Sequence, residues 1–130
     1  SRLTNQLYAP LLKELDITYP QYLVLLVLWQ KGSQKVTDIS SQLYLDTGTL
    51  TPMLKRMEEK GLVRRTRSKE DERTVAIDLT DAGSALREKA LCVPMQLIAS
   101  FQEGGNLTMQ EVVAFKKTLD KIVGTLAGAV

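Results

Sequence analysis

The stretch DERTVAIDLT, residues 71–80, decides the fold of this chain because it joins a charged turn, a strand and the start of a helix. Apolar residues alternate with small or polar ones in VAIDL, so Thr74–Leu79 is predicted to be a half-buried strand. Leu62–Arg67 predicts the partner strand across a hydrophilic tip, and the two form a β-hairpin. Thr80 is expected to cap a helix that starts at Asp81.

The stretch LDTGTLTPMLKR, residues 45–56, predicts a helix that begins after Asp46 and runs to about Lys60, where Gly61 ends it. Its buried stripe is expected to comprise Leu50, Leu54 and Met57. Thr37 is expected to cap a shorter helix that runs through Leu43, just before a tight turn. Two short helices joined in this way and followed by a hairpin form a winged helix-turn-helix.

The remaining helices predict a mainly α fold with a small β-hairpin wing, an α+β arrangement. We expect a first helix to about residue 14, a central helix over 19–30 that Thr18 caps and that is apolar nearly all round, and a long helix over 81–101. Thr108-Met109-Gln110-Glu111 is a capping box for a last helix with a wide apolar stripe.

Length and composition exclude several classes of protein. A chain of 130 residues is expected to form one domain, and no apolar run approaches the roughly 20 residues that span a membrane. The sequence contains no His, no cluster of metal ligands, no glycine-rich phosphate loop and no pairing of a nucleophile with a base. We therefore expect no enzyme activity, no metal and no cofactor. A single Cys fits a reducing cytoplasm, and the missing initiator Met predicts that residues precede Ser1.

The charge of the chain is concentrated rather than large. The net charge is only +2, but the segment from Lys60 to Lys69 contains five cations and no acid. Such a run is most often a solvated surface. Beside a helix with exposed hydroxyl and basic groups, it indicates contact with double-stranded DNA. We expect residues 47–56 to enter the major groove and residues 65–73 to reach the flanking minor groove.

The candidate DNA contacts come from these two segments. In the helix they are Thr47, Gly48, Thr49, Thr51, Pro52, Lys55 and Arg56. In the wing they are Arg65, Arg67, Lys69, Asp71 and Arg73. The early hydroxyls lie where free N–H groups and the helix dipole attract phosphate, although threonines there also serve as caps. The Asp71 carboxylate is expected to hold the Arg73 guanidinium for the minor groove; the alternative is an exposed ion pair without a function.

The first and last helices carry more apolar surface than a winged core of this size can bury. A homodimer that pairs through them would cover that surface and match the half-sites of a palindromic operator. We therefore predict one domain over 1–130, in which 1–14 and 81–130 form dimerisation helices and 34–80 form the DNA-binding lobe. The alternative is that both ends pack on their own core.

The wing resembles that of the MarR family of bacterial regulators, whose pattern Asp-x-Arg followed by Leu-Thr is matched by Asp71, Arg73, Leu79 and Thr80. Within that family, YLDTGTLTPMLKRME (44–58) and LDITYPQY (15–22) resemble the branch of organic hydroperoxide sensors called OhrR. The resemblance covers nearly the whole chain. It implies a dimeric transcriptional repressor that leaves its operator when an organic hydroperoxide oxidises a cysteine in the first helix.

The resemblance also implies a sensing pocket. Tyr8 and Tyr19 match two tyrosines that bind the reactive thiol in that branch, where phenolic hydroxyls would stabilise a thiolate. Residues 1–7 contain no Cys, so the reactive cysteine is expected upstream of residue 1. The single thiol, Cys92, fits a buried inert cysteine better than a partner thiol. The alternative is a MarR-type repressor released by a small aromatic ligand, in a pocket lined by Tyr8, Tyr19 and Trp29.

Overall fold

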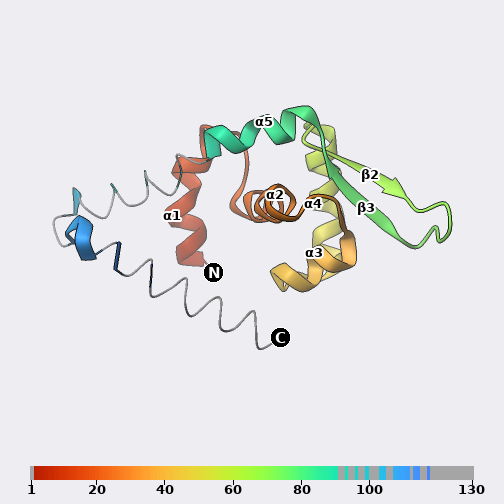
Figure 1. Ribbon diagram of the computed structural model, residues 1–130, viewed down its shortest axis with the longest axis horizontal. Coiled ribbons are helices and arrows are strands. Elements are labelled where there is room, and N and C mark those ends of the chain that lie inside the picture. The colour runs from red at the N-terminus through yellow and green to blue at the C-terminus, as the bar shows by residue number, and fades with distance from the viewer. Residues whose placement is uncertain are drawn as a thin grey trace. The chain divides into compact units, whose positions relative to one another are not determined.

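The computed structural model describes residues 2–90 and, beyond them, 93, 96, 99, 103–104, 107–111, 113–114 and 117; over 2–7 it describes the backbone. The chain divides into two compact units, residues 1–93 and 94–130. In chain order the first unit contains α1 (Arg2–Lys13), α2 (Tyr19–Lys31), β1 (Gln34–Lys35), α3 (Val36–Leu43), α4 (Thr47–Glu59), β2 (Val63–Arg67), β3 (Val75–Leu79) and α5 (Asp81–Ala90) (Figure 1). This order of helices and hairpin confirms the mainly α, winged helix-turn-helix fold.

The central helix of the first unit is α2. Its Val24, Leu25 and Leu28 side chains are buried, and it packs against α1, α3 and α5. Figure 1 looks along α2 and shows these helices around it. Thr18 and Gln21 form a capping box at its start, in which the Gln21 N–H donates to the Thr18 hydroxyl at 3.3 Å. The expected apolar core helix is thus confirmed.

The second helix of the helix-turn-helix is α4, which begins after Asp46 and ends at Glu59, close to the expected bounds. Its buried side chains are Leu50, Leu54 and Met57, as expected, and also Met53. Gly61 follows with a φ of 76°, a left-handed conformation that glycine adopts without strain. Because one stripe of α4 is held in the core, its hydroxyl and basic side chains are left on the outside.

The shorter helix, α3, starts before the cap expected at Thr37. Its first residue is Val36, its N-cap is Lys35, and no side chain caps it. The helix starts early because Gln34 and Lys35 pair with β3, and this pairing fixes the chain up to the first helical residue. The expected cap is therefore wrong, and Thr37 lies exposed in the first turn of α3.

The sheet has three antiparallel strands in the order β1-β3-β2. The hairpin of β2 and β3 lies within one residue of its expected bounds, and Val63 pairs with Leu79 at its base. The sequence does not predict β1, because a strand of two residues is too short to show a period. This strand ties the start of α3 to the wing.

The wing is anchored to α5 at Gly83. Thr80 caps α5 as expected, since its hydroxyl accepts from the Gly83 N–H at 3.1 Å. The Trp29 indole N–H donates to the Gly83 carbonyl at 2.9 Å, which joins α2 to the same turn. A Cβ at Gly83 would lie 2.1 Å from the Leu62 carbonyl oxygen, so this close approach requires glycine.

The second unit contains the expected capping box at Thr108 and Glu111. The Glu111 N–H donates to the Thr108 hydroxyl at 3.1 Å, and the Thr108 N–H donates to the Glu111 carboxylate at 3.4 Å. The described residues do not include Cys92, the expected end of the long helix at 101 or any residue of the apolar stripe expected in the last helix. Within the described part of the chain, no helix has the length and apolarity needed to cross a bilayer.

Candidate nucleic-acid interface

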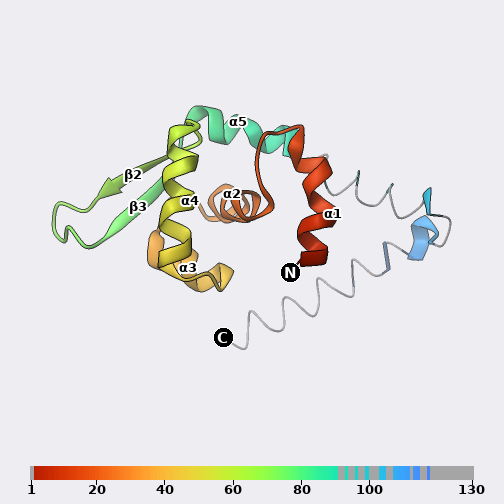
Figure 2. The ribbon, with the colours of Figure 1, turned by 180° about the vertical axis from the view of Figure 1, so that it is seen from behind.

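The outward face of α4 carries the DNA contacts expected from this helix. All of these residues are exposed: Thr47, Gly48, Thr49, Thr51, Pro52, Lys55 and Arg56. Figure 2 shows α4 along its whole length on the near side, beside the wing. A helix with one polar outward face next to a hairpin has the form needed to enter a major groove.

The first turn of α4 is closed by Asp46. Its carboxylate accepts a hydrogen bond from the Thr49 N–H at 2.6 Å, and this bond lowers the pKa of Asp46. A Cβ on Gly48 would lie 3.3 Å from an oxygen of the same carboxylate, so the glycine gives the cap room. The expectation that free N–H groups of this turn attract phosphate is therefore wrong for Thr49, whose N–H is already bonded.

Arg65 links the wing to α4 through Glu58. Its backbone N–H donates to one oxygen of the Glu58 carboxylate at 2.9 Å, and its guanidinium lies 3.1 Å from the other oxygen. The hydrogen bonds from Arg65, and secondarily its charge, lower the pKa of Glu58. Arg65, a DNA contact expected from the sequence, is thus partly exposed and already paired with a carboxylate.

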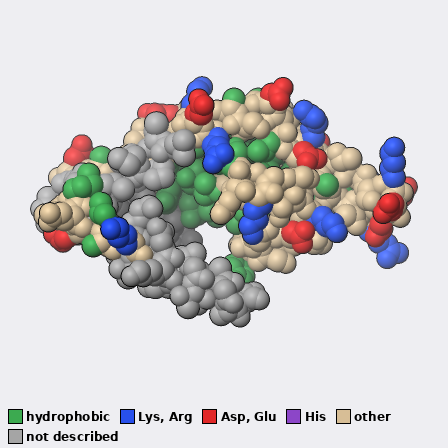
Figure 3. Space-filling view, viewed as in Figure 1, with side chains coloured by type: hydrophobic (Ala, Val, Ile, Leu, Met, Phe, Trp, Pro, Cys, Tyr) green, Lys and Arg blue, Asp and Glu red, His purple; other side chains and the backbone are tan. Residues whose placement is uncertain are grey.

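Asp71 stabilises the turn at the wing tip by accepting hydrogen bonds from backbone N–H groups. The Asp71 carboxylate accepts from the Arg73 N–H at 3.0 Å, and its carbonyl accepts from the Thr74 N–H at 2.9 Å. Among the described residues, no ion pair joins the Asp71 carboxylate to the Arg73 guanidinium, and an aspartate two residues upstream readily bonds the backbone N–H. Figure 3 shows basic and acidic side chains mixed at the end of the wing. The Arg73 guanidinium stays exposed.

A groove of about 400 Å³ lies between α4 and the wing, and we call it the α4–wing groove. The expected DNA contacts that line it are Thr47, Thr51, Lys55, Arg65, Arg67 and Arg73. Lys35 and Thr37, which the sequence reasoning did not include, also line it. None of the described residues along this groove carries a carboxylate, so its lining is positively charged.

A second groove, of about 590 Å³, lies between α4 and the segment that joins α1 to α2; we call it the α1–α4 groove. Thr49 and Arg56 line it, so these two expected contacts face a different space. Lys60 and Tyr19 line it too, and the Lys60 ammonium donates to the Asp16 carbonyl at 2.6 Å. This bond joins the end of the α4 segment to the α1–α2 connection. The expected contacts that line neither groove are Gly48, Pro52, Lys69 and Asp71.

The two tyrosines expected in the sensing pocket lie together. The ring centroids of Tyr8 and Tyr19 are 5.0 Å apart, and those of Tyr8 and Tyr22 are 6.0 Å apart. Burial, and secondarily the neighbouring Tyr19, raises the pKa of Tyr8, so its phenol stays protonated and able to donate. Trp29 instead packs edge-on against Tyr22 at 6.4 Å. Of the three aromatic residues expected to line a ligand pocket, Tyr19 lines the α1–α4 groove, whereas Tyr8 and Trp29 do not line it.

The sequence does not predict a place in the site for three residues: Lys35, Thr37 and Glu58. Lys35 belongs to a strand too short to recognise, and Thr37 follows the pattern of a helix cap. Glu58 is one of several charged residues at the end of a helix, and its partner is on the next strand. No short-range pattern marks these residues, because each acquires its place from an element outside its own helix or strand.

The chain is similar to known transcriptional regulators. Residues 6–90 match the family model described as transcriptional regulator SarA/Rot. The chain is 47% identical over 126 residues to the organic hydroperoxide resistance transcriptional regulator of Bacillus subtilis (strain 168), and the match covers 97% of this chain and 83% of that protein.

Two solved structures of DNA complexes are similar to the chain. One is overoxidized AbfR, a Staphylococcus epidermidis protein, bound to DNA, with a TM-score of 0.69 and 37% identity over 99% of this chain and 85% of that chain. The other is a mutant of MarR from E. coli complexed with operator DNA, with a TM-score of 0.74 and 30% identity over 93% of this chain and 86% of that chain.

Proposed function

Because the chain belongs to the MarR and SarA/Rot group of transcriptional regulators, in the organic hydroperoxide resistance branch, we propose that it is a DNA-binding repressor released by oxidation. Its operator is a palindromic double-stranded DNA in the bacterial cytoplasm, and its effector is an organic hydroperoxide. It acts as a regulator and not as an enzyme, so peroxide is consumed only in the sensing event.

The outward face of α4 beside the α4–wing groove carries this proposal. Thr47, Thr51 and Lys55 are exposed on α4, where they reach base edges and phosphates of a major groove. Arg73 is exposed on the wing, and its guanidinium suits the negative potential of a narrow minor groove. Lys69 at the tip adds a phosphate contact.

Two copies of the chain bind one operator in this proposal. Residues 1–14 and 81–130 form the dimerisation helices, and residues 34–80 form the DNA-binding lobe. Leu12 of α1 is fully buried in the core of the first unit. A partner bound through α1 is therefore held at a defined position relative to α4, as two half-sites require.

The proposed sensor is a cysteine upstream of Ser1 whose thiolate accepts hydrogen bonds from Tyr8 and Tyr19. Neutral phenols that donate to a thiolate lower its pKa and raise its reactivity. The thiolate sulfur attacks a peroxide oxygen of the organic hydroperoxide, so the O–O bond breaks. The cysteine becomes a sulfenic acid, and the departing alkoxide takes a proton from water to give the alcohol.

Oxidation is then transmitted to the DNA-reading helix over a short path. Tyr19 is the first residue of α2, and the preceding connection carries the Asp16 carbonyl that Lys60 bonds. A shift of a few ångströms in α4 is enough for release, because both copies must fit adjacent grooves at once.

A second candidate effector, a small aromatic ligand, is favoured by the α1–α4 groove. Its volume of about 590 Å³ falls in the range of ligand sites, and Tyr19 offers a ring for stacking. Lys13 and Arg56 supply positive charge for a carboxylate on the ligand. Such a ligand would act on α4 directly.

Operator binding at several salt concentrations tests the repressor. The affinity is measured for duplex DNA from the protein's own promoter. Its logarithm is expected to fall linearly as the logarithm of the salt concentration rises. Absence of binding, or a flat profile, would overturn the proposal.

The effector is tested on the protein that includes the residues upstream of Ser1. Release by tert-butyl hydroperoxide that a thiol reductant reverses supports redox sensing. Release by benzoate alone supports the aromatic ligand and contradicts redox sensing.

A further inference from the structure

We propose that Lys35 and Thr37 bind a phosphate of the DNA strand that passes between the major and the minor groove. This inference rests on the proposed function and adds to it a phosphodiester site outside α4 and the wing hairpin. The position of the two residues in the α4–wing groove carries it.

The α4–wing groove is the place where a DNA backbone has to pass. In a duplex, one sugar–phosphate strand separates the major groove from the adjacent minor groove. With α4 in the major groove and the wing in the flanking minor groove, that strand crosses the space between them. The junction of β1 and α3 lines this space, so its side chains face phosphates rather than base edges.

The lining of the groove suits an anion. Lys35, Lys55, Arg67 and Arg73 line it with exposed side chains, and the described lining residues include no acid. Arg65 is the lining cation that is already paired with a carboxylate of α4. Cations gathered around a concave surface attract phosphate, and they release counterions when it binds.

The sheet holds Lys35 at this groove. Its Cα pairs with that of Ala76 in β3, and the next residue starts α3. The backbone of Lys35 is therefore fixed before DNA arrives, so binding does not have to order it. Thr37 follows in the first turn of α3 with an exposed hydroxyl. A lysine ammonium and a threonine hydroxyl are both common donors to DNA phosphates.

The test is Lys35→Ala and Thr37→Val in the intact chain, with binding measured on the operator and on a scrambled duplex of equal length. Lys35→Ala is expected to weaken binding to both duplexes by a similar factor. It should also reduce the slope of log affinity against log salt by about one. Thr37→Val is expected to weaken binding without changing the slope, and Lys35→Arg to keep the wild-type slope.

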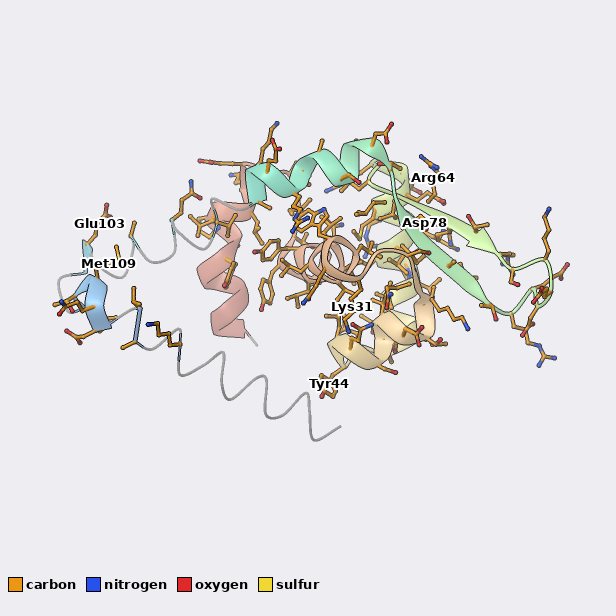
Figure 4. All side chains as sticks on the ribbon, in the orientation of Figure 1. Lys31, Tyr44, Arg64, Asp78, Glu103 and Met109 are labelled. Atoms are coloured by element: carbon orange, nitrogen blue, oxygen red, sulfur yellow. The ribbon has the colours of Figure 1, made fainter. Side chains whose placement is uncertain are left out.

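Lys31→Ala is the matched control. Lys31 ends α2, is exposed and does not line the α4–wing groove (Figure 4), so its loss removes the same charge without the contact. Equal slopes for Lys35→Ala and Lys31→Ala would overturn the inference. If the unchanged chain fails to bind its operator, the proposed function falls instead. Thermal unfolding checks each variant, and Lys35→Gln replaces Lys35→Ala if the alanine disturbs β1.

Discussion

Glu58 of α4 and Arg65 of β2 form an ion pair at 3.1 Å, and the Arg65 backbone N–H donates to the same carboxylate at 2.9 Å. In the proposed DNA complex, the helix and the wing must reach neighbouring grooves of one duplex at the same time. A direct bond between them helps to fix the distance that the DNA has to match. The bonds of Arg65 to Glu58 therefore help to set the position of the wing relative to α4.

We expect Glu58→Gln to reduce the pH dependence of stability. Hydrogen bonds from Arg65 hold the folded-state pKa of Glu58 below its ordinary value of 4.5. Such a carboxyl stabilises the folded state above its unfolded-state pKa, and this contribution is lost as the pH falls through the folded-state pKa. Between about pH 7 and pH 3, the free energy of unfolding in urea should fall more for the wild-type chain than for the variant.

Glu59→Gln is the control for this experiment, because Glu59 is the exposed neighbour on the same helix. It is expected to keep the wild-type pH dependence. Asp46, whose pKa is also lowered, accounts for part of the fall in every variant. An equal change in Glu58→Gln and Glu59→Gln would show that the link to Arg65 does not stabilise the fold.

Arg73→Ala is expected to weaken operator binding about tenfold or more without unfolding the chain. The exposed guanidinium lines the α4–wing groove and is proposed to enter the minor groove. Arg64→Ala is the control, since Arg64 is exposed on the same hairpin, pairs in register with Asp78 and lies outside that groove (Figure 4). Fluorescence anisotropy with labelled operator measures both, and equal losses would contradict the assignment of Arg73.

Gly83→Ala is expected to destabilise the fold by about 1–3 kcal/mol. The added Cβ would lie 2.1 Å from the Leu62 carbonyl oxygen, so α5 and the base of the wing must separate. Ser84→Ala, at an exposed position of the same helix, is expected to stay within about 0.5 kcal/mol of wild type. Urea unfolding of a Gly83→Ala variant that matched wild type would rule out this close approach.

Tyr8→Phe and Tyr19→Phe are expected to slow release by organic hydroperoxide in a protein that carries the proposed upstream cysteine. Each change removes one hydroxyl donor from a pair of rings 5.0 Å apart, which raises the pKa of the proposed thiol. Tyr22→Phe, which alters a buried neighbour of the same cluster, is the control. Stopped-flow anisotropy measures the rates, and a common rate for all three variants would exclude Tyr8 and Tyr19 from sensing.

Short-range chemistry made most of the elements predictable. Asp46 and Thr80 each bond an N–H three residues on, and Gly61 ends a helix at the residue where the chain turns. The spacing of Leu50, Leu54 and Met57 indicates the buried side of α4, because the helical repeat alone places them together. Signals of this kind act over a few residues and can be read along the chain.

The sequence by itself determined which side chains of the helix-turn-helix face outward. Only the tertiary structure decided which of them share a groove: β1 brings Lys35 to the wing, Glu58 neutralises Arg65, and the Asp71 carboxylate bonds a backbone N–H. The physical reason is that burial follows the period of a single helix or strand. The partner of a charge depends instead on the distance between elements, which is set only when the elements pack.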